Sequence, residues 1–150
     1  IPWYRIPAAV DMSRDELKRH ADGIRIFEGM KQVIENLRQS FSLGILTTNK
    51  VETVHRVLKN NAIDLTAFRF IVGGGSLFGK KKILSRIRRS EKLEKSKMVY
   101  IGDEVRDIQA ARKFRIATVA VSWGYNDREV LKEQRPDHLV DQPLDLMSIF

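Results

Sequence analysis

The chain has 150 residues, of which 43% are hydrophobic, and it carries a formal net charge of +8. A chain of this length can bury one ordinary core, and its lack of cysteine excludes disulfides and thiolate metal sites and favours a reducing compartment. No apolar run approaches the length of a membrane span and no secretory signal is recognisable in these residues, so we expect a cytoplasmic chain with no membrane partner.

The first residues differ in character from the rest. They contain two prolines and no hydrophobic period, after which Ser13 and Glu16 form the capping box of a helix. We interpret residues 1–23 as the C-terminal tail of a helical cap. The remainder, residues 24–150, is interpreted as one α/β core.

Four short apolar segments bounded by turn residues predict buried strands of a parallel sheet. In chain order these strands cover residues 42–47, 68–73, 97–102 and 116–122, and residues 137–140 add a short edge strand. The intervening segments place apolar residues three and four apart, as helices packed on a sheet require. These helices cover residues 27–40, 50–61, 83–93 and 106–114. The alternation indicates a three-layer, Rossmann-like open parallel sheet.

Much of the excess positive charge lies in residues 80–97. Such a run could follow a phosphate backbone, and that alternative predicts an affinity for nucleic acid that falls steeply with salt. Acidic residues interrupt the run, however, and no aromatic side chain stands within it. We therefore interpret it as a solvated helix face and do not expect a nucleic-acid partner.

Polar side chains follow three of the predicted strands, at the point where each strand ends. In an open α/β sheet ligands bind outside the carboxyl ends of the strands, so these side chains are the candidates for a site. Thr47, Thr48 and Asn49 follow the first strand; Lys80, Lys81 and Lys82 come soon after the second; Asp103, Glu104 and Asp107 follow the third.

This set of residue types is coherent for phosphate chemistry with a hard cation. Carboxylate oxygens suit Mg²⁺, which keeps several waters and usually takes one or two protein carboxylates. A threonine hydroxyl together with N–H groups at a helix N-terminus can hold phosphate oxygens. A lysine offsets the charge that phosphate and carboxylates bring together and stabilises the transferring group.

With these residues in place, the chain resembles the haloacid dehalogenase-like (HAD) superfamily of phosphohydrolases, and most of all its phosphoglycolate phosphatase-type branch. The resemblance runs from about Ile24 to the C-terminus. Its most specific part is GDEVRD, residues 102–107, which matches the acidic GDxxxD motif after a hydrophobic strand. LGILTT, residues 43–48, matches the strand ending in threonine, and WGYN, residues 123–126, resembles the loop after the next strand.

The resemblance implies a role for each matched residue. Thr47 is the phosphate-binding hydroxyl, and Thr48 and Asn49 supply neighbouring contacts to the phosphate. Lys80 is the catalytic and phosphate-binding lysine, with Lys81 or Lys82 as the alternatives. Asp103 is then the Mg²⁺ ligand, and Asp107 supports both the metal and the lysine.

One family motif has no counterpart here. The resemblance implies a DxDx(T/V) motif at the end of the first strand, whose leading aspartate attacks phosphorus, yet the 150 residues contain no Asp-x-Asp. Two explanations stay open. The chain can be a fragment that begins inside the cap, so that the missing segment or another chain supplies the nucleophile, or it can be a variant that has lost this residue.

The expected function follows from the first explanation. The intact protein is expected to be a Mg²⁺-dependent phosphatase that cleaves a small phosphorylated metabolite through an aspartyl-phosphate, while this chain alone is inactive because no other residue is placed to replace the nucleophile. The alternative is a catalytically silent phosphate-binding or regulatory module on the same fold. Dehalogenation is disfavoured because it does not need the metal-binding acidic pair.

Overall fold

The computed structural model describes residues 20–74 and 79–150. It divides into two units, and each is described by itself. One unit ends at Gly75 and also includes Leu146–Phe150, and the other comprises Ser76–Asp145. In the described ranges, no helix is both long enough and apolar enough to cross a bilayer.

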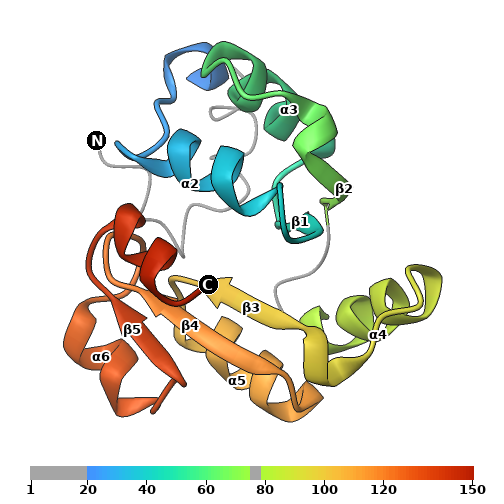
Figure 1. Cartoon of the computed structure of the whole chain (residues 1–150), viewed down its shortest axis with the longest axis vertical. Helices are drawn as coiled ribbons and strands as arrows, with labels where there is room; N and C mark the ends of the chain where they lie inside the picture. Colours follow the sequence, from blue (N-terminus) through green and yellow to red (C-terminus); the bar gives the residue numbers. More distant parts are fainter. Residues whose placement is uncertain (1–19, 75–78) are drawn as a thin grey trace. The chain divides into compact units, whose positions relative to one another are not determined.

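The first unit is built around a pair of parallel strands. Strand β1 (Leu43–Leu46) pairs with β2 (Phe68–Val72), and helix α3 (Val51–Asn60) connects them, as Figure 1 shows. The crossover helix is what allows two consecutive strands to run parallel. Helix α2 (Met30–Leu37) precedes β1. The unit also contains two short 3-10 turns, Ala21–Gly23 and Leu65–Ala67.

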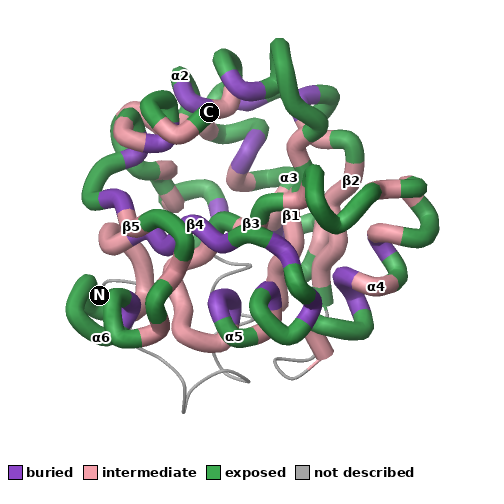
Figure 2. The backbone as a smooth tube through the Cα atoms, turned by 60° about the horizontal axis from the view of Figure 1, so that its bottom comes forward, coloured by how far each residue is buried: buried purple, intermediate pink, exposed green. Residues whose placement is uncertain are grey.

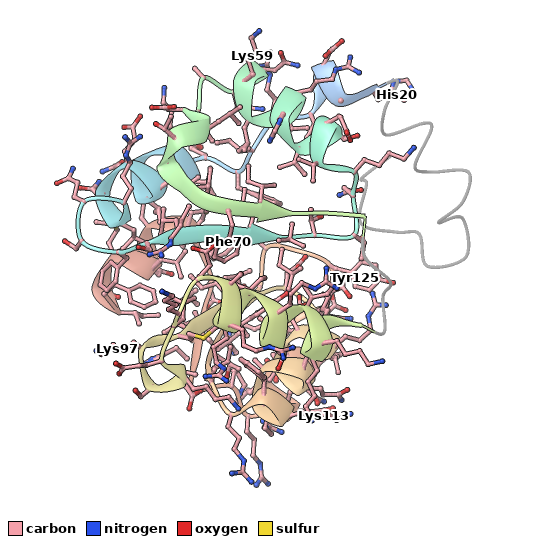
Figure 3. The ribbon with its side chains drawn as sticks, turned by 90° about the vertical axis from the view of Figure 1, so that its right-hand side faces the viewer. His20, Lys59, Phe70, Lys97, Lys113 and Tyr125 are labelled. Carbon is pink, nitrogen blue, oxygen red and sulfur yellow. The ribbon has the colours of Figure 1, made fainter. Side chains whose placement is uncertain are left out.

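Close packing explains a glycine inside β1. Gly44 is the register partner of Phe70, which is labelled in Figure 3. A Cβ at Gly44 would lie 2.1 Å from Cζ of the Phe70 ring, so the ring occupies the space that any larger residue would need. Glycine usually weakens the interior of a strand, but here it allows close contact with an aromatic ring.

The second unit contains a three-stranded parallel sheet in the order β3–β4–β5. Helix α5 packs against β3 and β4, and α4 contacts α5 (Figure 1). In chain order the elements are α4 (Lys80–Ser90), a 3-10 turn (Lys95–Lys97), β3 (Val99–Gly102), α5 (Val105–Phe114), β4 (Ala117–Val121), α6 (Arg128–Glu133) and β5 (His138–Val140). A further 3-10 segment, Pro143–Ser148, follows β5.

The core of this unit lies between the sheet and its helices. Ile108 of α5, Ala120 of β4 and Leu131 of α6 form one buried cluster, and Leu139 of β5 packs against it. Figure 2 shows buried positions along β4 and on one side of α5. A strand buried on both faces reads as a continuous apolar run, and for this reason β4 could be predicted from sequence.

The predicted fold class is confirmed. All five predicted strands are present with slightly shorter bounds, and all pair in parallel. Within the described residues they form a two-stranded sheet in the first unit and a three-stranded sheet in the second. The helix expected over residues 83–93 begins earlier, at Lys80, and α6 was not predicted. Most of the expected cap tail, including its capping box, lies outside the described residues, so the boundary at residues 23 and 24 stays a prediction.

A carboxylate outside the candidate site ties the region before β5 to β4. Oδ2 of Asp137 accepts hydrogen bonds from the backbone N–H of Thr118 at 2.7 Å and from its hydroxyl at 3.0 Å, and the Thr118 hydroxyl accepts from the Asp137 N–H at 3.1 Å. The backbone N–H of Thr118 is the main reason that the pKa of Asp137 lies below its ordinary value of 3.8.

These hydrogen bonds predict a pH-dependent contribution to stability. Because folding lowers the pKa of Asp137, the contribution is present above about pH 4 and is lost as the pH falls through the folded-state pKa. We expect Asp137→Asn to cost about 1 kcal/mol of unfolding free energy at pH 7, a modest value since the carboxylate is exposed, and less at pH 3. Urea denaturation at both pH values measures this.

Asp127→Asn is the matched control, because the side chain of Asp127 makes no capping hydrogen bond to α6. Equal losses of stability for the two variants at both pH values would contradict the assigned role of Asp137.

Candidate active site

The acidic motif lies where β3 passes into α5. The strand ends at Gly102, Asp103 follows it, and Glu104 takes the extended N-cap conformation before the helix begins at Val105. The carboxyl end of a parallel strand and the N-terminus of the next helix therefore meet at these residues. This is the position at which open α/β sheets bind ligands, and the helix N-terminus favours negative charge there.

Asp103 is held by the loop that follows β4. Its Oδ2 accepts a hydrogen bond from the backbone N–H of Tyr125 at 2.6 Å, and its backbone oxygen accepts one from the N–H of Asn126 at 3.0 Å. Burial raises the pKa of Asp103, and the nearby carboxylates of Asp107 and Glu104 raise it further. A cation beside Asp103 would favour the charged carboxylate and so oppose both increases in its pKa.

Asp107 lies in the first turn of α5 and is buried. Its Oδ1 accepts a hydrogen bond from Nζ of Lys80, the first residue of α4, and the two side chains are only 6% and 12% exposed. Lys81 and Lys82 are exposed. The structure thus brings Lys80, of the three candidate lysines, together with the second aspartate of the motif.

Tyr100, in β3, also contacts Asp107, and the sequence analysis did not single it out. Its hydroxyl donates to Oδ1 of Asp107 at 3.1 Å. Burial raises the pKa of Tyr100 well above its ordinary value, and the charge of Asp107 adds to the shift. The tyrosine therefore stays a neutral donor that fixes the carboxylate. Gly102 makes the approach possible, since a Cβ there would lie 2.6 Å from Oδ2 of Asp107.

Glu104, the third acid in this stretch, is paired with a cation. Its carboxylate accepts from the guanidinium of Arg106, two residues further on. Glu104 is therefore engaged as a neighbouring polar residue, and Asp103 and Asp107 remain as the acidic pair.

The carboxylates present fit Mg²⁺ as a site with only one or two protein ligands. Among residues 20–74 and 79–150, no three His, Cys, Asp or Glu side chains are grouped closely enough to hold a metal ion by themselves. Mg²⁺ does not need such a group, because it commonly binds one or two carboxylates and completes its shell with water and substrate oxygens. Asp103 is the better candidate, since Lys80 and Tyr100 share Oδ1 of Asp107.

Thr47, Thr48 and Asn49 belong to the first unit and form the turn between β1 and α3. The N–H of Thr47 donates to Val72 at 2.9 Å and so continues the β1–β2 ladder, and its hydroxyl accepts from the N–H of Asn49 at 3.1 Å. All three residues are partly exposed. The N–H of Gly74 donates to the oxygen of Asn49 at 2.8 Å, so this turn is tied to the end of β2.

The family is decided by comparison with known protein families. Residues 5–121 match the family described as haloacid dehalogenase-like hydrolase. The chain belongs to this family. The resemblance predicted from GDEVRD and LGILTT is thereby confirmed.

Relatives of this HAD-like chain include named phosphatases. It is 33% identical over 148 residues to a phosphoglycolate phosphatase of Synechococcus elongatus, a match that covers 98% of this chain and 69% of the relative. It is 29% identical to the pyrophosphatase PpaX of Listeria welshimeri, with 89% of this chain and 63% of the relative covered. The chain thus spans about two thirds of the length of these relatives.

A solved structure of a HAD-like hydrolase shares the fold. A haloacid dehalogenase-like family protein of Streptococcus pneumoniae superposes with a TM-score of 0.83 at 26% identity, covering 95% of this chain and 68% of that one. The family and the shared fold place this chain among hydrolases of the phosphatase type.

Proposed function

We propose that the intact protein is a Mg²⁺-dependent phosphatase that hydrolyses a small phosphate monoester through an aspartyl-phosphate, with the nucleophile outside these 150 residues. The observation that carries this proposal is the buried pair of Lys80 and Asp107 beside Asp103 at the start of α5. The names of the relatives, a phosphoglycolate phosphatase and a pyrophosphatase, support a phosphorylated metabolite as substrate.

Each residue has a distinct role in this proposal. Asp103 holds Mg²⁺, which when bound polarises a phosphoryl oxygen as a Lewis acid. Asp107, whose carboxylate accepts a hydrogen bond from Tyr100, holds the ammonium of Lys80, which offsets the charge of the transferring phosphoryl group. Thr47 donates its hydroxyl to a phosphate oxygen, and the turn formed with Thr48 and Asn49 supplies further donors.

The nucleophile is proposed to lie on an additional strand. Covalent catalysis of this kind needs a positioned aspartate, and the chain contains no Asp-x-Asp. Strands β1 and β3 are both edge strands in the described residues, since each pairs with one neighbour only. An exposed edge is costly, so these edges support the presence of another strand in the intact protein.

The test compares the 150-residue chain with the same chain extended at its N-terminus by the residues that precede Ile1. Both are assayed with p-nitrophenyl phosphate at saturating Mg²⁺. We expect turnover from the extended chain only. Equal turnover from both would overturn the proposal, and so would an extended chain that contains an Asp-x-Asp strand and still does not turn over.

A second candidate is a silent phosphate-binding module on the same fold. The lack of an Asp-x-Asp motif favours this function unless a segment outside these 150 residues supplies the nucleophile. It predicts that inorganic phosphate binds to the extended chain with Thr47-dependent affinity while no ester is cleaved, and the same assay separates the two functions.

A further inference from the structure

The loop that joins β4 to α6, residues Ser122–Asp127 and hereafter the β4–α6 loop, makes three contacts with the start of α5. Two are the hydrogen bonds to Asp103 from the N–H groups of Tyr125, labelled in Figure 3, and Asn126. In the third, the side-chain oxygen of Asn126 accepts from the N–H of Val105 at 2.9 Å. The loop therefore contacts both Asp103 and the first helical residue of α5.

The contact to Val105 replaces a missing cap. The first N–H groups of a helix have no partner within it, and a side chain at the N-cap position usually satisfies one of them. Glu104 holds the N-cap position of α5 but makes no such bond, because its carboxylate is paired with Arg106. Asn126, distant in sequence, supplies the cap instead and fixes the start of α5 to the loop.

Gly124 allows the loop to approach so closely. A Cβ at this position would lie 2.1 Å from Oδ2 and 2.2 Å from Cβ of Asp103. Any side chain here would displace either the loop or the carboxylate. The loop is thus shaped around Asp103.

The loop is itself anchored at both ends. The N–H of Ser122 donates to the backbone oxygen of Val140 at 3.0 Å. The Ser122 hydroxyl and Nε of Arg128 both donate to Oδ1 of Asp141, each at 2.8 Å. Because Ser122 and Arg128, at the two ends of the loop, both bind Asp141, the loop is held in place and can fix the position of Asp103.

We propose that Asn126 is a positioning residue for Asp103: it fixes the carboxylate and the start of α5 in the geometry that binds Mg²⁺, with Gly124 providing the room. This inference rests on the proposed function, in which Asp103 is a metal ligand. Residues that orient a metal ligand typically change metal affinity by 10- to 100-fold when they are replaced.

The test measures Mg²⁺ binding to the intact protein by calorimetry, with no substrate present. We expect Asn126→Ala and Gly124→Ala to weaken Mg²⁺ affinity at least about tenfold. Asn126→Asp keeps an acceptor oxygen for Val105 and is expected to retain affinity within about threefold. Gln109→Ala is the matched control, because it removes a different side-chain amide contact of α5, the one to Gln134, without touching Asp103.

Amide hydrogen exchange gives a readout independent of the metal. In Asn126→Ala the N–H of Val105 is expected to exchange faster, and in Asn126→Asp it is expected to stay protected. Should Asn126→Ala fail to fold, Asn126→Gln keeps the amide but moves it by one methylene and is expected to weaken Mg²⁺ binding likewise.

The outcomes separate the two proposals. If the unmodified protein binds Mg²⁺ and Asp103→Asn abolishes binding, while Asn126→Ala binds as well as the unmodified protein, the role of Asn126 is overturned and the proposed function stands. If Asp103→Asn binds Mg²⁺ as well as the unmodified protein, both fail. Equal weakening by Gln109→Ala would overturn the inference as well.

Discussion

Asp103→Asn is expected to lower kcat/KM of the intact protein for p-nitrophenyl phosphate by about 10³-fold or more. The substitution keeps the shape of the side chain and an oxygen that can accept from the N–H of Tyr125, so the β4–α6 loop is expected to stay in place. It removes the negative charge that would bind Mg²⁺. Steady-state kinetics over a Mg²⁺ titration, with circular dichroism to verify folding, measures the effect.

Glu104→Gln is the matched control for this prediction. It removes a neighbouring carboxylate that is engaged by Arg106, and it is expected to change kcat/KM less than tenfold. An Asp103→Asn protein with near-normal turnover would show that no carboxylate is needed at this position. Equal losses for the two variants would show that negative charge in this region in general, rather than a specific ligand, matters.

The strands could be predicted because each is short, mostly apolar and bounded by turn residues, and their ends could be predicted less well. Residues 97 and 98 were expected to begin a strand, but a 3-10 turn ends at Lys97 and the strand starts at Val99. Helix α6 was missed because it has only six residues and one buried side chain, Leu131, which leaves no hydrophobic period to detect.

The acidic pair and the lysine of the candidate site could be predicted only where the spacing of neighbouring residues determines their positions. The acidic pair stands at fixed positions after β3, so its location on the first turn of α5 was predictable. Three consecutive lysines left the choice among them open. The structure distinguishes Lys80 from the others because it alone is the first residue of α4 and pairs with Asp107.

Tyr100 and Asn126 show what local patterns do not contain. Tyr100 reads as an ordinary strand residue, and only the packing of α5 on β3 brings its hydroxyl to Asp107. Asn126 reads as a loop residue, and its contact with Val105 spans 21 positions. The contact of Asn126 also depends on the pairing of β3 with β4, which a single sequence does not specify. Thr47, in contrast, is placed by its own strand, and its proximity to Asp103 and Lys80 stays a prediction.

The ion pair of Lys80 and Asp107 is expected to have the largest single effect on stability. Removing one member of a buried pair leaves the other charge without its partner, at a cost of about 3 kcal/mol or more. Lys80→Met should therefore destabilise the second unit strongly, since within residues 20–74 and 79–150 Asp107 would keep only Tyr100 as a side-chain donor. Urea denaturation at pH 7 without Mg²⁺ measures the change in unfolding free energy.

A double-mutant cycle distinguishes a lost pair from lost packing. Lys80→Met with Asp107→Leu replaces both charges by apolar groups of similar volume, and this is expected to be less destabilising than the sum of the single substitutions by about 2 kcal/mol. Lys97→Met is the control, because Lys97 pairs with Glu94 at 3.2 Å on an exposed surface and should cost less than about 0.5 kcal/mol. If Lys80→Met costs no more than Lys97→Met, the pair does not organise the start of α5. Lys80 would then be available to a phosphate without Asp107 holding it, and the positioning role assigned to Asp107 would have to be abandoned.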